Sequence, residues 1–325
     1  MILVMRRVCS ISWLLLVAAA CSGCGHAAGK GTPATESTGS DATPAPLSVV
    51  CTTAQVADML ENIGGSHVKV VALMGPGVDP HLYKATPGDI RRLKRADVIF
   101  YSGLHLEGRL AAVLEKLAEK KPAVAVTAGV REHQPQRLRS APEFAESYDP
   151  HAWFDVGLWA DCAEYAAGKL IELDPAHAAD YRANADRYVA QLKDLDRWCR
   201  ERILEIPEKQ RVLVTAHDAF GYFGRAYGIE VHGLQGISTA DEADLGALND
   251  LVRLLVSHRI KAVFIESSVP RKSITSLIEG CDAAGHQVVI GGELFSDAMG
   301  NPGTPEGTYV GMVQYNVNEI VNALK

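Results

Sequence analysis

The feature that most constrains the fold is a rhythm in which short apolar segments alternate with amphipathic helical segments. Eight segments rich in Val, Ile and Ala are typical of buried strands: Leu47–Thr53, Val68–Met74, Ala96–Gly103, Ala123–Ala128, Arg211–His217, Ile229–Gly236, Lys261–Ser267 and Gln287–Gly292. Because these segments are apolar throughout, they indicate parallel sheets that are covered on both faces. The rhythm occurs once in each half of the chain, which predicts two four-stranded sheets.

Helical segments with one apolar face lie between these strands and after the last of them. They are Ala54–Ile63, Pro87–Arg95, Glu107–Lys120, Asp241–Arg259, Arg271–Ala284 and Thr308–Leu324. Two residues mark the start of the second helix. Threonine is a favoured N-cap residue, so Thr86 is a suitable cap, and Pro87 follows it at the first helical position, where proline is also favoured. In the last helix, Val313, Val317 and Ile320 belong to one apolar stripe.

A longer helical stretch, Pro175–Leu204, separates the two halves and contains no internal glycine or proline. At 1.5 Å per residue it would span about 45 Å, the breadth of a domain. We therefore predict an α/β fold of two (βα)4 lobes, each with a parallel four-stranded sheet, joined by one long rigid helix. The predicted N-terminal lobe is 47–174, the linking helix is 175–207 and the C-terminal lobe is 208–325.

The N-terminus is typical of an exported lipoprotein. Two arginines precede an apolar run, Val8–Ala20, that is shorter than the roughly 20 residues needed to cross a membrane. Small residues followed at once by cysteine resemble the lipobox of bacterial lipoproteins, so residues 1–20 are predicted to be a signal peptide. Cys21 is the preferred lipidation site because it directly ends the apolar run, and Cys24 is the alternative.

Residues 21–46 consist mostly of small residues and proline, which cannot form a core, and are predicted to be a flexible tether. The folded part therefore begins near Leu47. It contains four cysteines: Cys51, Cys162, Cys199 and Cys281. Their lack of close spacing favours small core residues over disulfides, and pairing remains the alternative.

The composition is that of an ordinary globular protein, with 47% hydrophobic and 22% charged residues. A chain of 325 residues is long enough for two cores. The net charge of -7 gives no reason to expect nucleic acid as a partner, because nucleic acid requires a basic patch. We expect a monomer that binds no nucleic acid.

Four potential metal ligands follow four of the predicted strands. The tripeptide Asp-Pro-His occurs twice and ends in His81 and in His151, whereas His217 and Asp297 each follow an apolar run in the second half. Ligands bind beyond the carboxyl ends of parallel strands, so two side chains from each lobe are expected to meet in the cleft between the lobes. Imidazole nitrogen together with carboxylate oxygen suits a borderline transition metal.

Each ligating imidazole is expected to pass its other N–H to a carbonyl or a carboxylate. Glu266, at the end of the seventh strand, is a candidate for this supporting role, and a carboxylate that only fixes a loop is the alternative. The remaining histidines of the folded part are interpreted as surface or core-edge residues: His67, His105, His133, His177, His232, His258 and His286.

From about Leu47 to the C-terminus the chain resembles the zinc/manganese solute-binding proteins of bacterial ABC importers (the cluster A-I family). The segments that carry the resemblance are VDPHLYKATPGDIRRLKRADVIFYSGLHLE, YDPHAWFDVGLWA, VLVTAHDAFGYFGRAYGIEVHGLQGISTADEA, FIESSVP and GGELFSDAMGNPGTPEGTYVGMVQYN.

The resemblance implies two (βα)4 lobes, a long linking helix and a metal bound between the lobes. It places the four ligands of the family on His81, His151, His217 and Asp297. It also implies an ABC permease and its ATPase as partners. The expected location is the bacterial cell envelope, periplasmic or extracytoplasmic, with a lipid anchor in the membrane.

Three imidazoles and one carboxylate favour zinc over manganese thermodynamically. Some family members have glutamate at the third position and prefer manganese, whereas this chain has His217. Zinc-uptake members often carry a long His/Asp-rich loop in the N-terminal lobe. The stretch Arg131–Asp149 has a single histidine, His133, and the absence of that loop argues against a purely zinc-scavenging role. On the nitrogen-rich ligand set we expect Zn²⁺ as the bound cargo, with Mn²⁺ next, and binding that weakens below about pH 6, where histidine becomes protonated.

Two other classes of protein remain as alternatives. Catalytic zinc keeps one position open for water, whereas four protein ligands close the site, and no nucleophile or general-base motif stands out; we therefore predict no enzyme activity. A lipoprotein in which the metal only clamps the lobes, or serves adhesion, is the main alternative. The uninterrupted linking helix predicts limited hinge motion, with local loop movement around the ligands.

Overall fold

The computed structural model describes residues 45–142, 144, 148–240 and 245–325. Residues Ala45–Lys325 form one compact unit. The predicted signal peptide, both candidate lipidation cysteines and the tether up to Pro44 lie outside the described residues. Within those residues, no helix combines the length and the apolar character needed to span a bilayer.

The part of the chain before the long helix α6 (Ala178–Ile203), here called the N-terminal half, contains one parallel sheet. Its strands are β1 (Leu47–Cys51), β2 (Val68–Ala72), β3 (Val98–Tyr101) and β4 (Ala123–Ala125), in the order β2-β1-β3-β4. Val49 of β1 lies opposite Val70 of β2 and Val98 of β3. Because all four strands run the same way, their carboxyl ends share one edge of the sheet.

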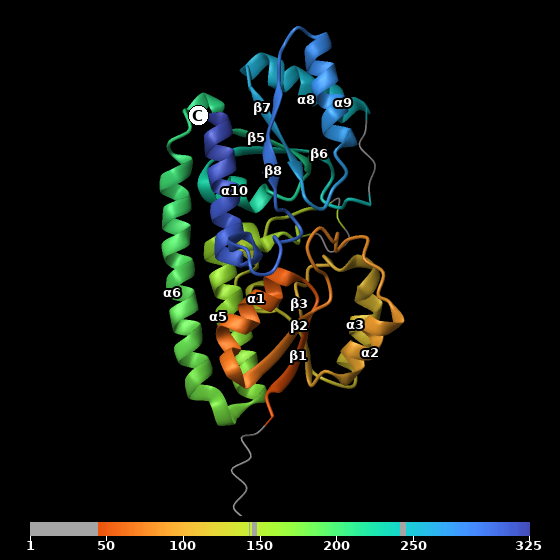
Figure 1. The fold of residues 1–325 in the computed structure, drawn as a ribbon, viewed down its shortest axis with the longest axis vertical. Helices are drawn as coiled ribbons and strands as arrows, with labels where there is room; N and C mark the ends of the chain where they lie inside the picture. Colours follow the sequence, from red (N-terminus) through yellow and green to blue (C-terminus); the bar gives the residue numbers. More distant parts are fainter. Residues whose placement is uncertain (1–44, 143, 145–147, 241–244) are drawn as a thin grey trace, which may run out of the picture. The chain divides into compact units, whose positions relative to one another are not determined.

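Helices cover both faces of this sheet, as the continuous apolar strands predict. They are α1 (Ala54–Gly64), α2 (Pro87–Arg95), α3 (Ala111–Ala118), α4 (Ala128–His133) and α5 (Val156–Leu173). Figure 1 shows α1 on one side of the sheet and α2 and α3 on the other. Helix α2 begins with the predicted cap, in which the Thr86 hydroxyl accepts the Asp89 N–H and the Asp89 carboxylate accepts the Thr86 N–H.

The part after α6, here called the C-terminal half, also consists of parallel strands and helices. Its strands are β5 (Val212–His217), β6 (Glu230–Gln235), β7 (Ala262–Glu266) and β8 (Val289–Leu294). Its helices are α7 (Gly221–Tyr227), α8 (Leu245–His258), α9 (Lys272–Ala283) and α10 (Tyr309–Leu324). The parallel α/β fold class is therefore confirmed.

The four strands of the C-terminal half differ from the prediction in one respect. They are hydrogen-bonded as two parallel pairs, β5–β6 and β7–β8, although β5 and β7 lie next to each other. At the end of β5 the His217 N–H donates to the Glu266 carboxylate of β7, at 2.8 Å, instead of to a backbone carbonyl. A side chain thus takes the place of a ladder hydrogen bond between the two pairs.

The long helix is one turn shorter than predicted. Pro175–His177 forms a short 3-10 turn, and α6 runs without interruption from Ala178 to Ile203. Figure 1 shows α6 alongside α5 and α10, and it contacts elements of both halves. Among its buried side chains are Tyr188 and Leu192.

Helix α5, which packs along α6, was not predicted from the sequence. Its N-terminus is capped by Asp155, whose carboxylate accepts the Leu158 N–H at 3.0 Å. Gly157 and Gly168 weaken the local helical signal, since glycine is a poor helix former. The buried face of α5 was nevertheless readable in the spacing of Val156, Trp159 and Ala163.

The core is continuous across the two halves. The Trp159 ring of α5 stacks on the Tyr309 ring of α10, with centroids 5.8 Å apart, and the Tyr309 hydroxyl donates to the Trp153 carbonyl at 2.6 Å. The cysteines of the described residues are buried and free, as interpreted from their spacing: Cys51, Cys162, Cys199 and Cys281. Such contacts are what the limited hinge motion expected from the sequence requires.

Asp58 of α1 is an acid placed in this core. It accepts hydrogen bonds from the Tyr188 hydroxyl of α6 and from the Asn62 side chain, both at 3.2 Å. Burial nevertheless raises the pKa of Asp58 to about 6. An unfolded aspartate loses its proton near pH 4, so this group destabilises the fold increasingly as the pH rises from about 4 to about 6.

We therefore expect Asp58→Asn to stabilise the metal-free protein at neutral pH. A pKa shift of about two units corresponds to about 3 kcal/mol, so the gain in unfolding free energy should grow by about 1–3 kcal/mol between pH 4 and pH 7. Urea unfolding at several pH values measures it, with the exposed Asp186→Asn as the control. A difference between variant and wild type that does not change with pH would contradict the assignment.

Candidate metal centre

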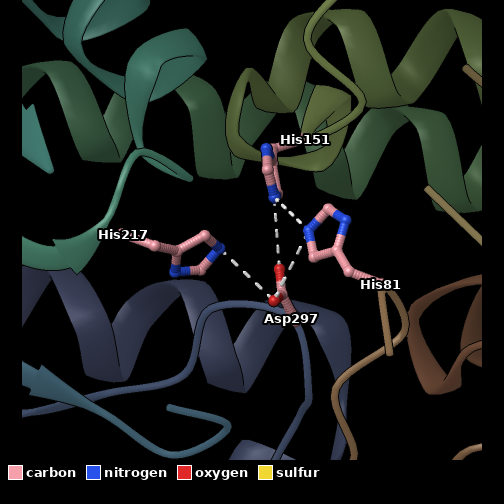
Figure 2. A group of neighbouring side chains, drawn as sticks. All are labelled: His81, His151, His217 and Asp297. Carbon is pink, nitrogen blue, oxygen red and sulfur yellow. Dashed lines mark hydrogen bonds and ion pairs between the residues drawn. The ribbon is translucent and has the colours of Figure 1, made fainter. Parts of the chain in front are cut away.

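The four predicted ligands come from four separate segments and meet at one point. His81 lies in the loop after β2, His151 lies in the loop before α5, His217 is the last residue of β5 and Asp297 follows β8. One ligand atom from each of them lies within 4.8 Å of all the others. Figure 2 shows the three imidazole rings directed at the carboxylate of Asp297.

The spacing of the ligand atoms suits a single metal ion. Nε2 of His151 lies 3.3 Å from Nε2 of His81 and 3.3 Å from Oδ1 of Asp297, and Nε2 of His217 lies 3.3 Å from Oδ2. Nε2 of His81 is farther from Oδ2 of Asp297, at 3.9 Å. Four ligands placed about 2.0 Å from a tetrahedral ion are themselves about 3.3 Å apart, so the distances from Nε2 of His151 already suit such an ion.

Burial makes this cluster costly without a cation. The exposed fraction is 5% for His81, 2% for Asp297 and 0% for His151 and His217. Both carboxylate oxygens of Asp297 and Nε2 of His217 have no hydrogen-bond partner among the described residues. A buried carboxylate that accepts no hydrogen bond is strongly destabilising. A divalent cation bound between the nitrogens and the carboxylate would remove this penalty.

The repeated Asp-Pro-His tripeptide is a repeated local conformation. In the first copy, Oδ1 of Asp79 accepts the N–H of His81 at 2.8 Å. In the second, Oδ1 of Asp149 accepts the N–H of His151 at 2.9 Å. Aspartate commonly closes a turn in this way by bonding the backbone two residues on. Each turn fixes the direction from which its histidine enters the site.

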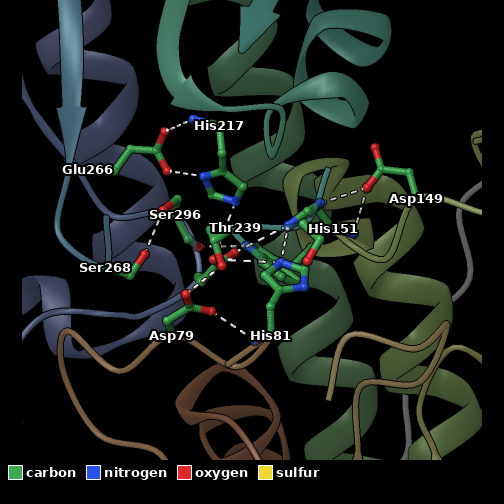
Figure 3. Close-up of polar contacts among 12 residues, drawn as sticks. Asp79, His81, Asp149, His151, His217, Thr239, Glu266, Ser268 and Ser296 are labelled. Atoms are coloured by element: carbon green, nitrogen blue, oxygen red, sulfur yellow. Dashed lines mark hydrogen bonds and ion pairs between the residues drawn. The ribbon is translucent and has the colours of Figure 1, made fainter. Parts of the chain in front are cut away.

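Carboxylates also orient two of the three imidazole rings (Figure 3). Oδ1 of Asp149 lies 2.7 Å from Nδ1 of His151, and Oε2 of Glu266 lies 2.5 Å from Nδ1 of His217. Such partners leave Nε2 free to ligate and increase its basicity. The Glu266 carboxylate thus lies where the supporting role suggested by the sequence would require it. The sequence analysis did not single out Asp149 for such a role, although Asp149 opens the second tripeptide.

The four candidate ligands come from both halves of the molecule. The segment that carries Asp297 belongs to the C-terminal half and accepts hydrogen bonds from the N-terminal half. The Gln55 side chain of α1 donates to the Asp297 carbonyl at 3.0 Å, and the Trp153 indole N–H donates to the Ser296 carbonyl at 3.1 Å. The other histidines of the described residues lie outside this group: His67, His105, His133, His177, His232, His258 and His286.

The surroundings shift the proton affinities of the cluster in opposite directions. Burial raises the pKa of the Asp297 carboxyl, but the His217 and His151 imidazoles more than offset this and hold it well below its usual range. Burial lowers the pKa of His81 to about 3. Burial also lowers that of His151, but the Asp149 and Asp297 carboxylates raise it to about 9. In the metal-free site, protons on the histidines therefore offset the negative charge of Asp297.

Comparisons with known proteins give one consistent family. The family model described as "ZnuA: Zinc-uptake complex component A periplasmic" matches residues 49–323. The manganese-binding lipoprotein MntA of Bacillus subtilis (strain 168) is 52% identical over 279 residues, which cover 86% of this chain and 90% of MntA. The zinc-binding protein TroA of Treponema pallidum (strain Nichols) is 48% identical over 276 residues, covering 85% and 88%.

The solved structure of the periplasmic zinc binding protein TroA from Treponema pallidum agrees with the fold. It superposes with a TM-score of 0.82 at 46% sequence identity, and the match covers 86% of this chain and 99% of that one. The names of these relatives include both zinc and manganese. These names therefore agree with a divalent transition metal and do not distinguish zinc from manganese.

Protons are expected to compete with metal in this site. Because His151 has its pKa raised to about 9, it holds a proton in the metal-free site at neutral pH and must release it before it can ligate. Affinity for Zn²⁺ should therefore decrease as the pH falls from about 9, and not only below about 6, the value expected for an unperturbed histidine.

Calorimetric titration with Zn²⁺ in buffers of different ionisation enthalpy measures this competition. About one proton or more should be released per ion bound at pH 7. Zero proton release at pH 7, together with equal affinities at pH 5 and pH 8, would contradict the assignment of these histidines.

The carboxylate of Glu266 is expected to strengthen binding through His217. Glu266→Gln leaves one carbonyl oxygen for two groups of His217, the backbone N–H and Nδ1, and removes the negative charge beside Nδ1, so it should lower metal affinity about tenfold or more. The matched control is Glu164→Gln on the surface of α5, which should leave affinity unchanged. Equal affinities for Glu266→Gln and wild type in the same titration would exclude the supporting role.

Proposed function

Because the chain belongs to the zinc-uptake complex component A family of metal ABC transporter substrate-binding proteins, we propose that it captures one divalent transition metal ion between its two halves and delivers it to a membrane permease. The observation that carries the proposal is the buried group of His81, His151, His217 and Asp297. These four side chains bring three nitrogens and one carboxylate to a single point.

The ion is cargo in this proposal, and the protein is not an enzyme. Four protein ligands fill a tetrahedral site and leave no position for a reacting water. The proposed domain division follows the sequence: the lobes are 47–174 and 208–325, and the helical linker is 175–207. We further propose that the protein acts as a monomer.

Zinc is proposed to bind more tightly than manganese. The affinity of a nitrogen-rich site rises along the series from manganese to copper and is lower again for zinc. Its affinity for zinc is nevertheless higher than its affinity for manganese. Asp297 directs one oxygen to His151 and the other to His217, so it can also bind a larger ion through both oxygens. Manganese is therefore the second candidate cargo, especially where its supply exceeds that of zinc.

The proposed location is the outer side of a bacterial membrane. The basic and apolar N-terminal segment and the Cys21 lipobox, with Cys24 as the alternative, are typical of a lipid-anchored protein. The relative MntA is named as a lipoprotein. The proposed partners are an ABC permease and the ATPase that drives it.

His217→Ala and Asp297→Ala should each lower Zn²⁺ affinity by about 100-fold or more, because each removes a ligand from a closed site. The exposed His133→Ala is the matched control and should bind as the wild type does. Competition with a chromogenic chelator measures all four proteins. Retained binding in both ligand variants would show that the metal lies elsewhere.

Competition between Zn²⁺ and Mn²⁺ is the second measurement. The wild type should prefer Zn²⁺, and His217→Glu should shift the preference towards Mn²⁺, because an oxygen replaces a nitrogen. A metal that does not exchange over hours, together with unfolding on chelation, would instead favour a structural clamp.

A further inference from the structure

We propose that Asp79 and Thr239 form a latch between the two halves that holds His81 on the metal, so that His81 is the first ligand to leave when the ion is released. The inference rests on the proposed function and adds an order of events to it. It comes from a difference between the two Asp-Pro-His copies, which share a turn but not their surroundings.

The second copy is fixed within the protein. Asp149 is fully buried, and its Oδ1 contacts both the N–H and Nδ1 of His151. Its Oδ2 accepts a hydrogen bond from Arg139 at 2.7 Å, and the Tyr222 hydroxyl donates to its carbonyl at 2.9 Å. Moving His151 would break a buried ion pair, which typically costs several kcal/mol.

The first copy is held differently. Oδ1 of Asp79 accepts the N–H of His81 at 2.8 Å and that of Leu82 at 3.4 Å, so Asp79 positions the backbone of the loop. Among the described residues, no carboxylate contacts Nδ1 of His81, whereas Asp149 contacts Nδ1 of His151 and Glu266 contacts Nδ1 of His217. His81 therefore depends on its loop to remain in place.

The loop is in turn attached to the other half of the molecule. Oδ2 of Asp79 accepts the Thr239 hydroxyl at 2.5 Å, and Thr239 follows β6 in the C-terminal half, 160 residues away in sequence. Figure 3 shows Asp79 between Thr239 and the backbone of His81. One carboxylate thus connects the position of the C-terminal half to the position of a ligand.

Because of its exposure, the Asp79–Thr239 hydrogen bond should break more easily than the contacts of Asp149 with His151. Asp79 and Thr239 are only half-buried, and the neighbouring Leu82 is exposed. Water can satisfy both groups when the latch opens, so its loss costs far less than that of the fully buried Asp149 pair. His81 is also the most exposed ligand, at 5%, and the one farthest from Asp297.

The latch reconciles release with a core that is continuous between the halves. A small displacement of the segment that carries Thr239 frees Asp79, after which the loop and His81 can move away without disturbing the packing of Trp159 on Tyr309. The ion then keeps three protein ligands and gains an open position, where water or an accepting ligand can bind.

Thr239→Val tests the latch, because valine keeps the shape of the side chain and removes the hydroxyl. Zn²⁺ release to excess chelator, followed by stopped flow, should be about tenfold faster, while the association rate should change less than about twofold. The matched control is Thr275→Val on the exposed face of α9, which should release Zn²⁺ as the wild type does.

A second pair of variants shows whether the effect passes through His81. In a His81→Ala background, Thr239→Val should no longer accelerate release, because the ligand that the latch holds is already absent. An equal acceleration in both backgrounds would show that Thr239 acts by another route and would overturn the proposal. An unchanged release rate for Thr239→Val alone would overturn it as well. If the wild type bound no Zn²⁺, the proposed function itself would fail, so the two failures are distinguishable.

Discussion

The candidate site depends on the buried carboxylate of Asp297. It lies among three imidazoles, and its oxygens accept no hydrogen bond among the described residues, although Nε2 of His151 and Nε2 of His217 each lie 3.3 Å from one of them. An arrangement of this kind is stable only with protons on the histidines or with a cation among them. The halves of the molecule meet at this point, because His81 and His151 enter from one side and His217 and Asp297 from the other. A cation bound at this point would therefore contact side chains from both halves.

The four candidate ligands are held with different firmness, and under the proposed function this difference would give the site a direction of opening. His151 and His217 have carboxylates behind their rings, whereas His81 depends on the turn made by Asp79. Helix α6 packs against α5 of one half and α10 of the other, and we expect this continuous packing to disfavour a wide hinge motion. Under the proposed function, a firm framework with one loosely held ligand would combine tight capture with release through a local movement.

Much of this could be predicted from the sequence, because the signals were local. The apolar strands, the Thr86 cap and the four candidate ligands were each readable within a few residues. His151 differs from the prediction in its position, because helix α4 separates strand β4 from the loop that carries it. Helix α5 was missed because two glycines weaken its local pattern. The Thr239–Asp79 contact and the division of the second group of strands into two pairs depend on segments that are distant in sequence. Only the folded chain shows them, since they follow from how separate elements pack.

The central claim is that His81, His151, His217 and Asp297 bind a single ion. Anomalous diffraction from crystals of the Zn²⁺-loaded protein, recorded on both sides of the zinc absorption edge, tests it most directly. We predict one strong peak about 2.0–2.2 Å from the three Nε2 atoms and from a carboxylate oxygen of Asp297. A peak at any other place, or an ion that contacts fewer than three of these four side chains in the closed protein, would contradict the account.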